Sequence, residues 1–360
     1  MTVADRSPRL LTVGCVLPPH FVDQETIIAA FRDAWGQAHF NVERLEQLHR
    51  AVQVSGRYLA LPIEQYRELA SFARRNQVWT SVAVDVGEAA VRKALAAAGL
   101  EPTDVDHLFF VTTTGIATPS IDARLVNRVG LRPDVRRTPI FGLGCAGGAA
   151  GIARAGDYLR AFPDRVAVLL SVELCSLTLQ RDDFSIPNII SSGLFGDGAA
   201  AAVLAGAERH SEGGTEHPRI TATGSVFYRD SERVMGWDIV DSGFKVVLSA
   251  GVPEIVHAHV REDVTAFLAA HGLTRAQIRH WIAHTGGPKV LQAFEEALDL
   301  PAGALERSWK SLRETGNLSS AAVLFVLADL LASGAPARGD HGLLMAMGPG
   351  FCSELVLLEW

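Results

Sequence analysis

The sequence predicts an α/β fold built from two copies of one unit, because two pairs of segments recur at almost the same spacing. The stretch "LAAAGLEPTDVDHLFFVTTTG" at 95–115 is matched by "LAAHGLTRAQIRHWIAHTGG" at 268–287, an offset of 173 residues. The stretch "GCAGGAAGIARAGDYLRA" from Gly144 is matched by "GNLSSAAVLFVLADLLAS" from Gly316, an offset of 172 residues. In both copies helix-like stretches alternate with buried strand-like stretches, which is typical of α/β proteins.

The elements of the first copy follow from this pattern. Residues 31–75 are rich in charged helix formers, such as "VERLEQLHRA" and "PIEQYRELASFARR", and predict helices added to the duplicated core. An amphipathic helix then ends at Gly99, and a buried strand ends in the threonines at 112–114. A glycine turn at Cys145 begins a helix of small residues, and "RVAVLLSVEL" at 165–174 is the next strand.

The second copy repeats these elements after a polar, glycine-rich stretch at 205–220, which we interpret as the loop between the halves. We therefore divide the chain into an N-terminal half, 1–210, and a C-terminal half, 211–360. The second helix ends at Gly272, and "HGLLMAMGPG" at 341–350 is the strand that follows the second small-residue helix.

The repeat also predicts where reactive residues meet. A pseudo-twofold arrangement would place Cys145 and Asn317 at equivalent helix starts, close to a shared centre. His284 follows the strand of the second copy, at the end of an α/β sheet where loops usually hold the chemistry. We expect these three side chains to converge.

Composition excludes several classes of function. The chain has 360 residues, of which 48% are hydrophobic and 20% charged, and its formal net charge is −7. No run approaches the roughly 18 apolar residues needed to span a bilayer, and the N-terminus lacks the pattern of a secretory signal, so we expect a cytoplasmic protein without stable membrane insertion. No basic block is interleaved with aromatics, which argues against a nucleic-acid partner. Four scattered cysteines without a C-x-x-C pair argue against a disulfide framework and a zinc site.

Cys145 is a candidate nucleophile. Unpaired N–H groups and the dipole at a helix N-terminus stabilise a thiolate, and glycines leave room for an acyl group and free amides for an oxyanion. The alternative is a buried structural cysteine whose glycines serve only close packing.

His284 and Asn317 are its candidate partners. An imidazolium at His284 would depress the pKa of the thiol and supply thiolate at neutral pH, although most histidines are polar surface residues. The Asn317 amide would donate to a thioester carbonyl or an enolate, although an asparagine before Ser-Ser is also an ordinary helix N-cap.

Five motifs in order closely resemble the type III polyketide synthases, the chalcone synthase superfamily, over nearly the whole chain. They are "GLGCAGG", "SSGLFGDGAAAAVL", "HTGGPKVL", "GNLSSAAVLFVL" and the C-terminal "GPGF". The resemblance implies a homodimer of duplicated thiolase-like αβαβα subunits that extends a coenzyme A starter thioester with units from malonyl-CoA. No metal or other cofactor is implied.

The resemblance also implies roles for individual residues. Cys145 would carry the starter and the growing chain, His284 and Asn317 would bind the malonyl thioester during decarboxylation, and Phe195 would be the gatekeeping aromatic. An aromatic at Phe195 could equally be part of the core. Thr118 stands where plant members place a methionine that crosses the dimer interface.

Seven residues are expected to line the acyl and cyclisation pocket, and most of them are small. They are Thr113, Thr114, Cys175, Thr178, Gly243, Ser319 and Phe351. Small linings leave volume, so we expect an aliphatic or fatty acyl starter and an alkylpyrone or alkylresorcinol product. The "ELCSLT" stretch also resembles bacterial members that use malonyl-CoA alone and make a tetrahydroxynaphthalene, which is the alternative.

The coenzyme A contacts depart from the plant pattern. In "VERLEQLHRAVQVSGRY" Arg44 matches a basic position, whereas Gln47 and Ala51 stand at two others. Arg50 and Arg57 are candidate substitutes because a guanidinium suits a phosphate, although both could be solvated surface charges.

Other reaction classes fit less well. A single-round β-ketoacyl carrier-protein synthase uses the same Cys-His-Asn set, but "HTGGP" and "GPGF" disfavour it. A papain-type protease has the same chain order, but its cysteine lies near the mature N-terminus in a context absent here. A scaffold with a decayed site is disfavoured because all three residue types are present.

Overall fold

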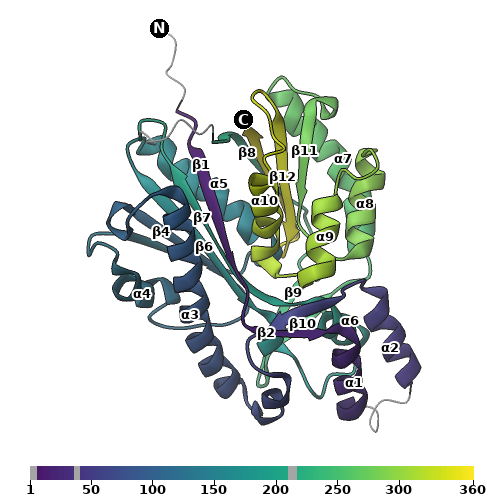
Figure 1. The fold of residues 1–360 in the computed structure, drawn as a ribbon. Helices are drawn as coiled ribbons and strands as arrows, with labels where there is room; N and C mark the ends of the chain where they lie inside the picture. The colour runs from purple at the N-terminus through teal and green to yellow at the C-terminus, as the bar shows by residue number, and fades with distance from the viewer. Residues whose placement is uncertain (1–5, 36–40, 210–216) are drawn as a thin grey trace.

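The computed structural model describes residues 6–35, 41–209 and 217–360 (Figure 1). Its main strands are β1 (Arg9–Val16), β4 (His107–Thr112), β5 (Arg136–Phe141), β6 (Val166–Leu174), β7 (Asp197–Ala205), β8 (Arg219–Phe227), β11 (Ile278–Ala283), β12 (His341–Gly348) and β13 (Cys352–Glu359). They form one mixed sheet in the order β11-β12-β13-β8-β1-β7-β6-β4-β5. Two small sheets pair β2 (His20–Asp23) with β3 (Gly56–Leu59) and β9 (Met235–Val240) with β10 (Gly243–Leu248).

The strand pairing confirms the predicted duplication. In the first half β4 is parallel to β6, β6 is antiparallel to β7, and β7 is antiparallel to β1. In the second half β11, β12, β13 and β8 repeat the same sequence of parallel and antiparallel pairs. The halves join where Arg9 of β1 pairs with Arg219 of β8. The predicted boundary at 210/211 lies outside the described residues.

The helices complete a layered α/β/α/β/α arrangement. They are α1 (Gln24–Trp35), α2 (Val42–Ala51), α3 (Phe72–Ala98), α4 (Ile121–Leu125), α5 (Gly147–Ala161), α6 (Ile186–Leu194), α7 (Val252–Ala270), α8 (Pro288–Leu298), α9 (Glu306–Thr315) and α10 (Ala322–Ala332). Helices α5 and α10 pack against strands of both halves and form the central layer. Helix α3 covers the outer face of the first half, and α7 and α8 cover that of the second.

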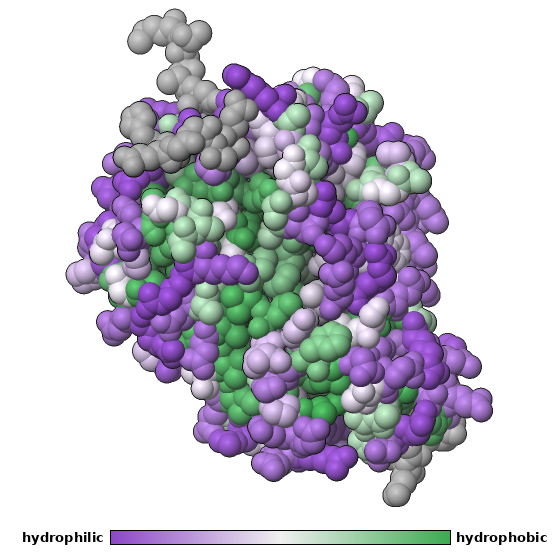
Figure 2. All heavy atoms as spheres, in the orientation of Figure 1, coloured by the Kyte–Doolittle hydropathy of each residue, from purple (hydrophilic) through white to green (hydrophobic). Residues whose placement is uncertain are grey.

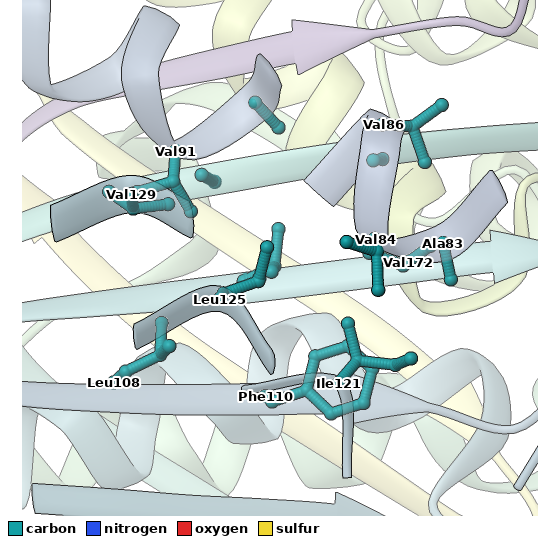
Figure 3. Close-up of a cluster of buried hydrophobic side chains, with 14 of the residues drawn as sticks. Ala83, Val84, Val86, Val91, Leu108, Phe110, Ile121, Leu125, Val129 and Val172 are labelled. Carbon is teal, nitrogen blue, oxygen red and sulfur yellow. The ribbon is translucent and has the colours of Figure 1, made fainter. Parts of the chain in front are cut away.

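The alternation of side chains along the strands explains this layering. In β12 Leu344 and Ala346 join the central hydrophobic cluster with α5 and α10, whereas Leu343 and Met345 join the outer cluster with α7 and α8. Both faces of the strands are therefore apolar, as a sheet between two helical layers requires. Figure 3 shows the outer cluster of the first half, where Val91 of α3 lies near Val129 and Ile121 lies near the Phe110 ring.

Glycines allow the two central helices to approach. A Cβ at Gly148 would lie 2.2 Å from the carbonyl oxygen of Ser320, and a Cβ at Gly147 would lie 2.6 Å from a methyl group of Val111. Part of the glycine cluster around Cys145 therefore serves close packing. This packing also brings the start of α5 to the segment before α10.

The expected equivalence of Cys145 and Asn317 is wrong by three residues. Cys145 lies two residues before α5, and the residue two before α10 is Ser320. Asn317 lies five residues before α10, ahead of the one-turn 3₁₀ helix η7 (Ser319–Ala321). The sequence alignment of the repeats missed this shift because both turns contain the same kinds of small residues.

The predicted additional helices at 31–75 are only partly present. The end of α1, the whole of α2 and the start of α3 are α-helical, but β3 interrupts them, and 63–68 form a 3₁₀ helix after Pro62. Gly99 ends α3 in the left-handed conformation with φ 65°, as the sequence predicts.

Figure 2 shows an apolar band along the middle of one face, in the place that β1 occupies in Figure 1. Strand β1 carries three half-exposed apolar residues, Leu11, Val13 and Val16. Within the described ranges, no helix combines the length and the apolar character that crossing a membrane requires.

Candidate active site

Cys145 lies in the 3₁₀ turn η4 (Gly144–Ala146), immediately before α5. Its side chain is buried, and its Sγ lies 3.9 Å from the Ser319 Oγ. Gly144 has φ 48°, and a Cβ there would lie 2.6 Å from the Pro349 ring. The glycine before the thiol is thus required by its conformation and by the "GPGF" turn that packs on it.

The backbone of Asn317 is hydrogen-bonded to the end of α6 and to the residues that follow this helix. Its N–H donates to the Leu194 carbonyl at 2.9 Å, and its carbonyl accepts from Gly196 N–H at 3.0 Å, so that it forms a bridge with Phe195. Its side-chain Oδ1 accepts from Ser319 N–H at 2.8 Å. This bond forms an Asx turn and not the helix N-cap expected of this asparagine, because Leu318 is the N-cap residue of η7. It occupies only the carbonyl side of the carboxamide.

The Asn317 side chain also acts on the thiol. Hydrogen bonds from Ser319 and Asn317 oppose the effect of burial on the pKa of Cys145. Both residues therefore lie where they favour negative charge on sulfur or on an adjacent oxygen.

His284 follows β11 and lies against the adjacent strand β12. Its backbone N–H donates to the Met345 carbonyl at 3.0 Å. Its side chain is buried, and within the described part of the chain neither ring nitrogen has a hydrogen-bond partner. Buried polar groups are normally paired, so an unpaired imidazole indicates that a bound molecule supplies the partner.

The expected thiolate–imidazolium pair is not supported by the electrostatics. Burial raises the pKa of Cys145 to about 12, and burial lowers the pKa of His284 to about 4. Both side chains are therefore neutral near pH 7. The physical reason is that the site is closed to water, which disfavours both charged forms.

Glu173 is a polar site residue that the sequence reasoning missed. It lies on β6, is fully buried, and accepts hydrogen bonds from Thr113 N–H and the Thr114 hydroxyl, each at 3.0 Å, and from the Ser320 hydroxyl. Burial raises its pKa to about 7, and its charge contributes to the raised pKa of Cys145. A single acid within the apolar strand "VAVLLSVEL" was the available signal.

Four of the candidate pocket residues lie near Glu173 or along a narrow hollow. Thr113 and Thr114 join the Glu173 network, and burial, together with the nearby charge of Glu173, raises the pKa of the Cys175 thiol. Thr178 and Thr114 border a narrow hollow that Phe72, Trp79 and Phe244 also line.

Gly243 and Phe351 open no space of the expected kind. Gly243 has φ 104°, and a Cβ there would lie 2.7 Å from the Phe72 ring. Phe351 is fully buried in the hydrophobic cluster of the second half, where its ring lies 6.0 Å from that of Tyr228. The expectation of a large volume from small residues is therefore wrong at Gly243, because an aromatic ring occupies the place of the missing side chain.

Trp237 is a second residue that the sequence reasoning missed. It comes from β9, and its indole N–H donates to the Thr113 hydroxyl at 3.1 Å. Its ring centroid lies 6.2 Å from that of Phe244. A large aromatic side chain thus reaches a threonine that was expected to border open volume.

The three candidate arginines for coenzyme A have different surroundings. Arg44 is exposed on α2. Arg50 is also exposed, but its guanidinium pairs with Glu25 at 2.9 Å and with Glu46 at 3.2 Å. Arg57 is 2% exposed and donates to the Ser192 carbonyl, so its assignment to a solvent-borne phosphate is wrong.

A closed site with a neutral thiol, in the central layer of a duplicated α/β fold, suits the transfer of acyl groups between thioesters. The fold and this site define a thiolase-like acyltransferase. Two family models, described as the N-terminal and C-terminal domains of chalcone and stilbene synthases, match residues 2–208 and 219–359. The chain belongs to this family, the type III polyketide synthases, which condense malonyl-CoA units.

Individual relatives agree with this assignment. The chain is 49% identical to 1,3,6,8-tetrahydroxynaphthalene synthase of Streptomyces peucetius subsp. caesius, over 100% of this chain and 95% of the relative. It is 33% identical to phloroglucinol synthase of Pseudomonas fluorescens, over 96% and 97% of the two chains. The crystal structure of the Streptomyces coelicolor A3(2) tetrahydroxynaphthalene synthase aligns with a TM-score of 0.91 at 32% identity, covering 98% of this chain and 99% of that chain.

Proposed function

We propose that this enzyme uses malonyl-CoA as both starter and extender and forms a product of the tetrahydroxynaphthalene type. Relatives named tetrahydroxynaphthalene synthase, one of them 49% identical, support this choice over the aliphatic starter that small pocket residues suggested. The expected alkylpyrone or alkylresorcinol product is therefore not the proposal.

The observation that carries the proposal is the contact of Trp237 with Thr113. The indole fills space beside the Glu173 network, and the hydrogen bond at 3.1 Å fixes its orientation. A side chain of this size bounds the room for an acyl chain, so short acyl groups are favoured over long ones.

The proposed chemistry begins with the neutral thiol. Cys145 attacks the starter thioester while His284 accepts the thiol proton, and the sulfur–carbonyl bond of the starter breaks. His284 then gives this proton to the departing coenzyme A thiolate and returns to its neutral form. Proton transfer during attack suits a site in which both groups are neutral at rest.

Extension then uses the other two site residues as donors. A second malonyl-CoA loses carbon dioxide, and its electron pair becomes an enolate whose oxygen is held by His284 and Asn317. The enolate carbon attacks the acyl-cysteine, and the Cys145 sulfur leaves. Preorganised neutral donors favour the enolate over the bound malonyl group, because the negative charge on that oxygen appears only during the reaction.

The remaining assignments are part of the same proposal. Phe195, half-buried after α6, would border the passage to Cys145, and exposed Arg44 would contact the coenzyme A phosphates. We also propose a homodimer, a cytoplasmic location and no cofactor beyond the coenzyme A substrates.

The test compares Trp237→Ala with the wild type by mass spectrometry of products from malonyl-CoA alone and with hexanoyl-CoA. Wild type should make the naphthalene product from malonyl-CoA alone. The variant should gain hexanoyl-primed products about 10-fold to 100-fold, since each newly buried methylene contributes about 0.8 kcal/mol and only part of the chain is buried.

Trp309→Ala is the matched control. Trp309 also donates its indole N–H to a side chain, Glu295 at 2.9 Å, but it lies on α9. It should leave the product pattern unchanged. Efficient hexanoyl-primed pyrone formation by the wild type would overturn the proposal.

A further inference from the structure

The C-terminal turn of α6 holds both Phe195 and the backbone of Asn317. The last four carbonyl groups of a helix have no partner within it and must find donors elsewhere. In α6 Ser191 O accepts from Phe195 N–H at 3.0 Å, and Leu194 O accepts from Asn317 N–H at 2.9 Å. The other two carbonyls receive side chains from the N-terminal segment.

Gln24, the first residue of α1, satisfies one of these carbonyls. Its Nε2 donates to Gly193 O at 3.1 Å and to His49 O of α2 at 2.8 Å. The side chain is 6% exposed. One carboxamide nitrogen therefore joins the ends of two helices. Helices α2 and α6 approach so closely that no residue larger than glycine fits at position 193, because a Cβ at Gly193 would lie 2.7 Å from the His49 ring.

Arg57 satisfies the other carbonyl, that of Ser192. Burial lowers the pKa of Arg57 to about 10 and the nearby charge of Asp197 opposes this change, so the guanidinium stays positive near pH 7. Asp197 is itself fixed, since it accepts from Ala60 N–H at 2.6 Å and from Ser176 N–H at 2.8 Å. Phe195 therefore lies between two anchored residues, Ser192 and Asp197.

These contacts support Asn317 but not the turn that carries Cys145. Cys145 belongs to η4 and α5, which make no part of this turn. Asn317 is attached to the turn by two backbone hydrogen bonds, to Leu194 and from Gly196. A displacement of the α6 terminus would therefore act directly on Asn317. It would reach the Cys145 thiol only indirectly, through the smaller effect of the Asn317 side chain on the pKa of that thiol.

We infer that Gln24 and Arg57 are positioning residues, which set where the Asn317 carboxamide meets the malonyl thioester. The inference rests on the proposed role of Asn317 in decarboxylation. Neither residue touches the substrate in this scheme. They act through the carbonyl groups of α6, and loss of either donor lets the turn relax away from the geometry that Asn317 needs.

The test uses Gln24→Met, which keeps the size of the side chain and removes both donors. Two rates are measured: conversion of malonyl-CoA to acetyl-CoA, in a Cys145→Ala background that prevents condensation, and alkylation of Cys145 by iodoacetamide in the otherwise native chain. We expect the kcat for decarboxylation to fall about 10-fold to 100-fold, as small misplacements of a catalytic group do. KM should change less than about threefold, and the alkylation rate less than about twofold.

Gln65→Met is the control, because Gln65 is exposed in the same N-terminal segment. It should leave both rates unchanged. If Gln24→Met does not fold, Arg57→Lys replaces it: the positive charge and N–H donors remain, but the longer, forked guanidinium is lost. We expect a smaller, separate loss of decarboxylation with little change in alkylation. A parallel fall of both rates would show a general loss of structure and overturn the inference.

The outcomes also separate this inference from the proposed function. A wild-type chain that does not decarboxylate malonyl-CoA overturns both. A wild-type chain that decarboxylates, with Gln24→Met and Arg57→Lys both at the wild-type rate, overturns the positioning role alone.

Discussion

Replacing Gly148 with alanine tests the close packing that brings the two copies together. The added Cβ would lie 2.2 Å from the Ser320 carbonyl oxygen, whereas ordinary contacts begin at 3.4 Å, so the segments must separate by 1.2 Å. The obstacle is backbone and cannot rotate away. Overpacking of this kind costs about 1–3 kcal/mol, and the helix preference for alanine over glycine returns about 0.5–1 kcal/mol. We expect a net destabilisation of about 1 kcal/mol.

Gly156→Ala is the matched control on the same helix. Its added Cβ would meet its nearest neighbour at 3.6 Å, an ordinary contact, so this variant should be about 0.5–1 kcal/mol more stable than wild type. Urea unfolding followed by circular dichroism gives the midpoints for all three proteins. A Gly148→Ala variant as stable as Gly156→Ala would refute the reasoning.

Two further predictions concern the chemistry of the site. Because the pKa of Cys145 is raised to about 12 and that of His284 lowered to about 4, alkylation of Cys145 should accelerate about tenfold per pH unit from about pH 6 to 9. Peptide mass spectrometry measures this rate, and a plateau at neutral pH would instead indicate a thiolate–imidazolium pair. Asn317→Ala should lower malonyl-CoA decarboxylation about 10²-fold, the usual effect of removing one oxyanion donor. Alkylation of Cys145 should slow much less, because the Asn317 side chain is only one of several groups that lower the pKa of this thiol. An unaffected rate of acetyl-CoA formation would contradict the proposed role of Asn317.

The parts of the fold that sequence predicted are those with a local or periodic signal. The helix stops at Gly99 and Gly272, the buried strand that ends at Thr112 and the one that ends before His284 all follow from patterns within a few residues. The spacing of the repeats adds the duplicated topology, since two similar segments form similar elements. The residue-by-residue correspondence between the two copies could not be predicted from the sequence. The turn before α10 contains several small residues, so the start of α5 can be aligned with it in two ways that differ by three residues.

The parts of the site that sequence could not predict depend on residues far apart in the chain. Trp237 reaches Thr113 across 124 positions, and Phe72 fills the space beside Gly243. The burial of Arg57 depends on α6, more than a hundred residues later. No local pattern encodes such distances, so the small size of Gly243 alone did not reveal that the Phe72 ring lies beside it.

The sequence by itself therefore determined the α/β class, the duplication and the family, because motif spacing and periodicity belong to the chain. The tertiary structure decided the charge states, the filling of the pocket and the support of α6. A pKa depends on how completely water is excluded, and the volume of a pocket depends on which distant side chains enter it. Both quantities exist only after the two copies have packed together.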